Sequence, residues 1–260
     1  DQSLEKGPLP MRGVALLHAC SATKCGGSRR LECSDVDYND PTRIPKLIEA
    51  LQRVWEGQPD LSLSALLGTL RNRGAEWGTS DEEVLEILNT MEAEHPSLVR
   101  WPAELPVTVQ TTAPEHRVTL SGSDVVVRPV GEGSRMPSAW KATHFRAVGP
   151  GRSLIVTDTE GIEHRLGVAT LVHSLDPDEA LPLEDLGQPD VGGARWFVGF
   201  EDGSRAIVGQ RITLWRPEGR RATSQESYKF ARILSCEEGA EMHFAPTGGG
   251  KPVSLGRGAP

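Results

Sequence analysis

Six cations and three aromatic side chains lie between residues 211 and 232, the stretch whose residue types come nearest to a chemical function. Cationic groups bind phosphates and aromatic rings stack on bases, so this mixture is typical of nucleic-acid surfaces. The alternative is an ordinary hairpin whose arginines balance neighbouring glutamates. We favour the hairpin, because residues 101–260 carry a net charge of −3, which gives no general attraction to phosphates. The candidate contacts are Arg211, Trp215, Arg216, Arg220, Arg221, Tyr228, Lys229 and Arg232.

A zinc site is the second chemical possibility. His18, Cys20, Cys25 and Cys33 offer the nitrogen and sulfur ligands that zinc prefers, close together in the sequence. Their spacing lacks the paired C-x2-C units of common structural sites, which favours free thiols over a metal centre. A third interpretation is that the residues before about Val36 have no folded role.

Three histidines of the second half, His144, His164 and His173, would form a metal site if their strands were neighbours. Single histidines in separate strands are more often exposed or hydrogen-bonded, and we favour that interpretation. Motifs of common enzymes are absent. The nearest match to a phosphate-binding loop, Gly250-Lys251, is followed by a proline where that loop needs serine or threonine. We therefore predict no catalytic residue, no metal and no other cofactor.

The elements that would position functional residues are clearest in residues 40–95, where the apolar spacing predicts three helices. We expect the first helix to bury its apolar face, Trp55 included. The second follows Ser62, and the third follows Ser80, whose partner Glu83 completes a capping-box pattern. The apolar residues of the first helix recur every three or four positions, at Ile44, Leu47, Ile48, Leu51, Val54 and Trp55.

A family resemblance covers residues 40–98, about a fifth of the chain. The segments that carry it are Arg43-Ile44, Leu47-Ile48-Glu49, Leu51-Gln52, Trp55, Pro59-Asp60, the leucine-rich second helix and the acidic opening Thr79-Ser80-Asp81. This pattern resembles the uncharacterised YihD-like family of small bacterial helical proteins, although the loop at residues 74–78 departs from it. The resemblance implies a compact helical fold and no catalytic residue.

Three short helices also suggest a helix-turn-helix that reads DNA. The third helix argues against this interpretation, because its exposed face is acidic and would repel phosphates. The carboxylates concerned are Asp81, Glu82, Glu83, Glu86, Glu92 and Glu94. We favour a bundle that is structural or faces another protein.

After a linker, the chain consists of short β-branched runs bounded by turn residues, which predicts an all-β domain. Two segments with an offset of 42 residues, 154–167 and 196–209, each predict a hairpin. Gly167 and Gly209 are expected to bend the return strands. We expect a small barrel, either SH3-like or built from the duplicated hairpin.

The second hairpin permits a more detailed prediction. Its alternation should direct Trp196, Val198 and Phe200 inward. A turn at Asp202-Gly203 should pair residues 195–201 with residues 204–214.

The predicted fold class is α+β with two domains, a three-helix bundle followed by an all-β domain. The ranges are a flexible N-terminal extension at 1–37, the helical bundle at 38–98, the β-rich domain at 99–245 and a disordered tail at 246–260. An acidic loop at residues 174–193 is expected to be a solvated linker between the two hairpins.

Composition limits the functional classes. The formal net charge is −8, and no apolar run approaches the roughly 20 residues needed to cross a bilayer. Four cysteines in 260 residues do not suggest a disulfide framework, and with the short apolar run before Cys20 they favour a cytoplasmic protein over an exported one.

The predicted function is a non-catalytic two-domain binding or adaptor protein that contacts another protein. The first alternative is a nucleic-acid-associated regulator that uses the basic and aromatic segment. An enzyme of unrecognised type is the third possibility.

Overall fold

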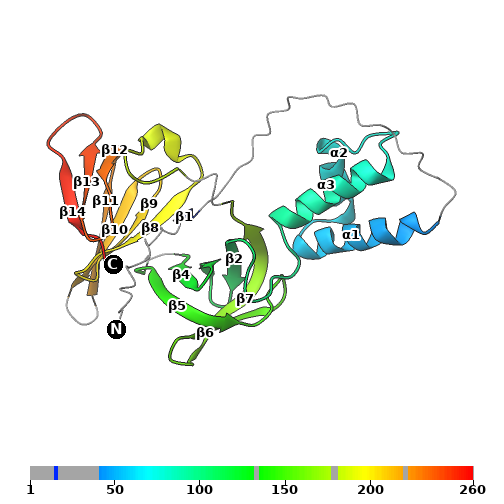
Figure 1. Cartoon of the computed structure of the whole chain (residues 1–260), viewed down its shortest axis with the longest axis horizontal. Helices are drawn as coiled ribbons and strands as arrows, with labels where there is room; N and C mark the ends of the chain where they lie inside the picture. Colours follow the sequence, from blue (N-terminus) through cyan, green and yellow to red (C-terminus); the bar gives the residue numbers. More distant parts are fainter. Residues whose placement is uncertain (1–14, 17–40, 132–134, 177–180, 219–221, 260) are drawn as a thin grey trace, which may run out of the picture. The chain divides into compact units, whose positions relative to one another are not determined.

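The computed structural model describes residues 15–16, 41–131, 135–176, 181–218 and 222–259. The chain forms two compact units. One, the helix-barrel unit, contains residues 20–131 and 139–175, and the other, the two-sheet unit, contains residues 1–19, 132–138 and 176–260. The predicted order of three helices followed by a β-rich region is confirmed (Figure 1). Most of the predicted extension at 1–37, with His18, Cys20, Cys25 and Cys33, lies outside the described residues.

Three helices open the described part of the helix-barrel unit, drawn in blue to cyan in Figure 1. They are α1 (Arg43–Gly57), α2 (Leu63–Asn72) and α3 (Asp81–Glu94). Together they enclose one apolar core, whose buried members are Ala50, Val54, Leu66, Leu70, Leu88 and Met91. None of the helices in the described ranges has the length and apolar character needed to cross a membrane.

Local signals in the sequence account for the starts of α2 and α3. The Ser62 hydroxyl accepts a hydrogen bond from the amide of Ala65, and Ser80 with Glu83 forms the predicted capping box. The Ser80 backbone and side-chain donors also lower the pKa of the Glu83 carboxyl. Position 57, the last of α1, requires glycine for a tertiary reason, because a Cβ atom there would lie 2.1 Å from the backbone oxygen of His95.

Six strands of the same unit form a closed antiparallel barrel, which confirms the predicted barrel. The strands are β2 (Val107–Thr112), β3 (His116–Ser121), β4 (Asp124–Pro129), β5 (Ser138–Phe145), β6 (Ser153–Asp158) and β7 (Glu163–Ser174). They neighbour one another in chain order, and β7 pairs with β2 to close the ring. Valines such as Val109, Val118 and Val156 fill its core.

The helices and the barrel are joined by main-chain and side-chain contacts. Val99 and Val148 exchange two backbone hydrogen bonds of 2.7 and 2.9 Å. His95, which follows α3, places its Nδ1 3.1 Å from the backbone oxygen of Val172 in β7. The predicted boundary between residues 98 and 99 is therefore wrong, because helices and barrel share one compact unit.

The two-sheet unit, coloured yellow to red beyond β7 in Figure 1, holds the remaining strands. Its larger sheet has the order β1-β8-β9-β10-β11, and its smaller sheet has the order β12-β13-β14. The strands are β1 (Ala15–Leu16), β8 (Arg195–Gly199), β9 (Arg205–Val208), β10 (Ile212–Glu218), β11 (Ala222–Tyr228), β12 (Phe230–Ser235), β13 (Glu241–Pro246) and β14 (Val253–Arg257). The predicted single β-rich domain at 99–245 is thus divided between the two units.

The predicted disordered tail at 246–260 is wrong for its described residues. Residues 253–257 form β14, which pairs with β13, and Gly258 bridges to Phe200. The acidic loop also differs from a solvated linker, because Leu186 and Val191 are buried and Gly187 pairs with Arg232.

Both predicted hairpins form, as β6–β7 and β8–β9. They belong to different sheets, so the barrel is not built from a duplicated hairpin. Gly167 lies within β7 at a φ of +103°, next to irregularities of register, whereas Gly209 lies just after β9.

The β8–β9 hairpin confirms most of its prediction. Trp196 and Phe200 are buried, Val198 is half-buried, and the turn contains Gly203 at a φ of +80°. The return strand ends at Val208, so the expected pairing up to residue 214 is too long.

Candidate functional site

The described nucleic-acid candidates lie on or next to β10, β11 and β12 of the two-sheet unit, and several of them bind other groups of the protein. The Arg211 Nε donates a hydrogen bond of 2.8 Å to the Ser227 hydroxyl. The Arg232 Nη1 lies 2.7 Å from a carboxylate oxygen of Asp185, and the Arg216 Nε lies 3.8 Å from one of Glu226. Lys229 is exposed, and Arg220 and Arg221 lie outside the described residues.

The aromatic members of this segment are poorly placed for stacking on bases. Trp215 is 7% exposed, so its indole is part of the core. The Tyr228 hydroxyl donates to Glu226, and its ring packs 5.5 Å from that of Phe244. Burial, followed by the bond to Glu226, raises the pKa of Tyr228. The described residues therefore favour the hairpin whose arginines are balanced by carboxylates.

The three candidate histidines do not converge. His144 contacts the ring of Trp101, His164 pairs with Asp158, and the ring of His173 lies 5.0 Å from that of His95. Within the described ranges, no group of three or more His, Cys, Asp or Glu side chains is arranged to hold a metal ion.

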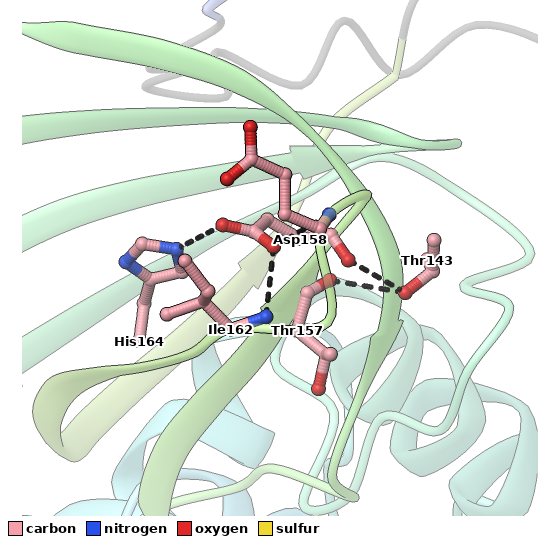
Figure 2. Close-up of polar contacts among 6 residues, drawn as sticks. Thr143, Thr157, Asp158, Ile162 and His164 are labelled. Carbon is pink, nitrogen blue, oxygen red and sulfur yellow. Dashed lines mark hydrogen bonds and ion pairs between the residues drawn. The ribbon is translucent and has the colours of Figure 1, made fainter.

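The densest polar arrangement is at the β6–β7 turn (Figure 2). Asp158 accepts hydrogen bonds of 2.9 Å from the amides of Glu160 and Ile162 on one oxygen, and its other oxygen lies 2.7 Å from the His164 Nε2. The bond to His164, followed by that from Ile162, lowers the pKa of the Asp158 carboxyl. The His164 ring also packs against Trp140, with centroids 4.5 Å apart.

A paired histidine and aspartate would activate a nucleophile in a hydrolase, so the neighbouring hydroxyl decides what this turn can do. Figure 2 shows the Thr143 hydroxyl directed at the backbone oxygens of Thr157 and Asp158, to which it donates at 3.4 and 3.1 Å. Figure 2 draws no contact between this hydroxyl and the His164 ring, whose Nε2 instead pairs with Asp158. The arrangement therefore closes a hairpin turn and does not activate Thr143.

One cavity of about 410 Å³ opens where the segment after α3 meets the barrel. Its polar side chains are Arg100, Glu104 and Ser174, and the rest of its lining is apolar. The volume is at the lower end of the range of small-molecule sites.

The largest departure from expectation is an exposed set of apolar side chains on the helices, which we call the apolar stripe. The predicted burial of Ile44, Ile48 and Trp55 is wrong. Helix α1 instead turns Ala50, Val54 and Gly57 into the core, about 130° around its axis from the exposed three. The stripe consists of Ile44 (49% exposed), Ile48 (57%) and Trp55 (37%) on α1, with Leu63 (44%) and Leu67 (51%) on α2.

A hydrogen bond ties the end of α1 to the loop before α2. The Trp55 Nε1 donates to the backbone oxygen of Leu61 at 2.8 Å, two residues before Leu63. Leu51 and Leu61, both partly buried, pack against the helical core. The indole of Trp55 therefore lies beside the loop that leads into α2.

A signal for the stripe was present in the sequence. The apolar face of α1 is wider than one packed contact needs, and the small residues Ala50 and Gly57 provide a second face for close packing. Periodicity identifies the helix, but it does not decide which of two adjacent apolar faces becomes buried.

Comparison with known proteins gives no relative. No family model matches the chain, and neither a curated protein nor a solved structure matches it significantly.

Proposed function

We propose that this chain is a non-catalytic binding protein that holds a partner protein on the apolar stripe. The observation that carries the proposal is the exposure of Ile48 and Leu67, each more than half exposed on regular helices with a well-packed core. Single exposed apolar residues are normal, but five large ones on two consecutive helices are more than scatter, and clustered exposure of this kind is typical of an interaction surface.

The polar arrangements of the described residues support a binding role more than a catalytic one. The His164–Asp158 pair holds a turn, and the described residues have no cluster of metal ligands. Helix faces with apolar residues at spacings of three and four commonly bind another helix or peptide.

Site-specific photo-crosslinking in the native host tests the proposal. A photoreactive amino acid at position 48 or 67 should give a protein adduct that survives nuclease treatment. The matched control is Ile162, which is 53% exposed on the β6–β7 turn. Equal adducts at positions 48, 67 and 162, or none at 48 and 67, would refute a partner on the stripe.

The remaining expectations stay predictions. They are the nucleic-acid role of residues 211–232, the resemblance of residues 40–98 to the YihD-like family, an SH3-like form of the barrel, and a cytoplasmic location. A nuclease-treated pull-down separates nucleic-acid bridging from direct protein contact.

A further inference from the structure

The partner of the apolar stripe can be specified further by the charges around it. We infer, on the basis of the proposed function, that the stripe binds a cationic amphipathic helix of another protein. The inference depends on three features: the spacing of the stripe, the sign of the surrounding charge, and the distribution of ion pairs on the helices.

The spacing fits a helical partner. Ile44, Ile48 and Trp55 lie on one side of α1, and Ile44 and Trp55 are separated by eleven residues, or about 16 Å along the axis. This is the length of about three helical turns, over which a partner helix presents anchors at positions i, i+3 or i+4, and i+7. Leu63 and Leu67 add a second row one turn apart on α2.

The charge around the stripe is acidic. Residues 41–100 contain ten acidic and six basic side chains. Three of the basic side chains are ion-paired within the helices, in the pairs Arg43–Asp81, Arg53–Glu92 and Arg73–Glu94. These three pairs neutralise themselves, and seven carboxylates remain against Lys46, Arg71 and Arg100, which leaves an acidic excess.

Two of the excess carboxylates adjoin the stripe. Glu49 and Glu56 are exposed and directly follow Ile48 and Trp55, about 100° around α1. Neither carboxylate has a described ion pair with a basic residue. A lysine or arginine on the rim of a bound helix would meet these carboxylates, which favours a cationic partner.

The same charge argues against a second copy of this chain as the occupant. Two copies joined through the stripe would bring Glu49 and Glu56 of one close to those of the other, and like charges across an interface are unfavourable. The full chain, at a formal charge of −8, adds to this repulsion.

Fluorescence anisotropy with three labelled peptides of about 18 residues tests the inference. The peptides share leucines at helical spacing and carry lysine, glutamine or glutamate at all other positions. We expect the lysine peptide to bind the full chain at least about tenfold more tightly than the glutamate peptide at about 50 mM salt. The difference should shrink at about 500 mM salt, because salt screens exposed charges.

Two double variants separate the effect on peptide binding of the carboxylates beside the stripe from that of the net charge of the chain. Glu49→Gln with Glu56→Gln should weaken binding of the lysine peptide several-fold. Glu201→Gln with Glu237→Gln removes the same charge from exposed positions of the other unit and should have little effect. Equal effects of the two pairs, or equal binding of the lysine and glutamine peptides, would overturn the cationic inference.

Variants of the apolar stripe distinguish a failure of the cationic inference from a failure of the proposed function. Ile48→Glu with Leu67→Glu should abolish peptide binding, and Ile162→Glu should not. If circular dichroism shows that the double glutamate variant has lost helix, the milder pair Ile48→Gln with Leu67→Gln takes its place. If these variants lose binding but the unmodified chain binds the lysine and glutamine peptides equally, the stripe remains the binding surface and the cationic partner is rejected. Binding that survives them, or a dimer in sedimentation that Ile48→Glu dissociates, would reject the partner on the stripe.

Discussion

The indole Nε1 of Trp55 donates a hydrogen bond to the backbone oxygen of Leu61, although more than a third of the side chain stays exposed. Trp55→Phe keeps an aromatic ring and removes the donor, so we expect it to lower the free energy of unfolding by about 0.5 to 1.5 kcal/mol. Urea denaturation measures this. A loss of about 3 kcal/mol or more, typical of a buried aromatic, would contradict the exposed position.

The Arg73–Glu94 pair predicts a pH-dependent contribution to stability. The two Nη atoms of Arg73 donate to the two carboxylate oxygens of Glu94 at 2.9 and 2.5 Å, and the hydrogen bond lowers the pKa of Glu94. Because the unfolded chain then binds a proton more readily, the contribution is present above the unfolded pKa of about 4.3 and is lost as the pH falls through the folded pKa.

Glu94→Gln tests this contribution. We expect the variant to be less stable at pH 7 by about 0.5 to 1 kcal/mol, and the difference should shrink between about pH 5 and pH 2. Glu49→Gln, at an exposed position without a described ion pair, is the matched control and should change little. A deficit for Glu94→Gln that is the same at both ends of this pH range would contradict the ion-pair origin.

Gly167 predicts a steric cost of substitution. A Cβ at this position would lie 2.6 Å from the backbone oxygen of Thr112 and 2.7 Å from that of Pro114. Gly167→Ala should therefore destabilise the barrel by at least about 2 kcal/mol. Gly161→Ala also has a positive φ but no atom within 4 Å, and it should cost only about 1 kcal/mol. Equal costs in thermal or urea unfolding would show that contact with the backbone is not the cause.

Cys236 should react slowly with alkylating reagents. Burial, followed by repulsion from Glu184, raises the pKa of its thiol to about 11. At pH 8 we expect mass spectrometry of the Cys236 peptide to show labelling by iodoacetamide at least about tenfold slower in the folded protein than in urea. Labelling at equal rates would show that the thiol is accessible and ionised.

The alternative nucleic-acid function has a direct test. Because Arg211, Arg216 and Arg232 are engaged within the protein, we expect no binding of single or double strands at about 50 mM salt. If binding occurs, its affinity should fall steeply with salt. Arg220→Ala with Arg221→Ala should then reduce the slope by about one to two phosphate equivalents, which would favour the alternative.

The sequence predicted those parts of the fold that depend on local interactions. The starts of α2 and α3 follow from serine caps, and the turn at Asp202-Gly203 follows from a glycine with positive φ. The assignment of hairpins to sheets could not be predicted, because β7 closes on β2 across about 60 residues and β1 pairs with β8 across about 180. Strand β14 was missed since a glycine-rich turn precedes it.

The spacing of apolar residues could not identify the apolar stripe. Ile48 and Val54 both belong to the apolar face of α1 in the sequence, yet one is 57% exposed and the other 1%. The buried face is the one that carries Gly57, where the backbone of His95 approaches α1 closely. Such a close tertiary contact has no signature in the spacing of apolar residues.

The pairing of β8 has a consequence for biosynthesis. Its Arg195 and Trp196 pair with Leu16 and Ala15, and the Gly199 oxygen accepts a hydrogen bond from the Ala259 amide. All residues of the helix-barrel unit precede residue 176, so a nascent chain can fold this unit before the two-sheet unit is complete. The larger sheet is complete once β11 has emerged, and Ala15 and Leu16 wait for β8 while about 180 further residues are made.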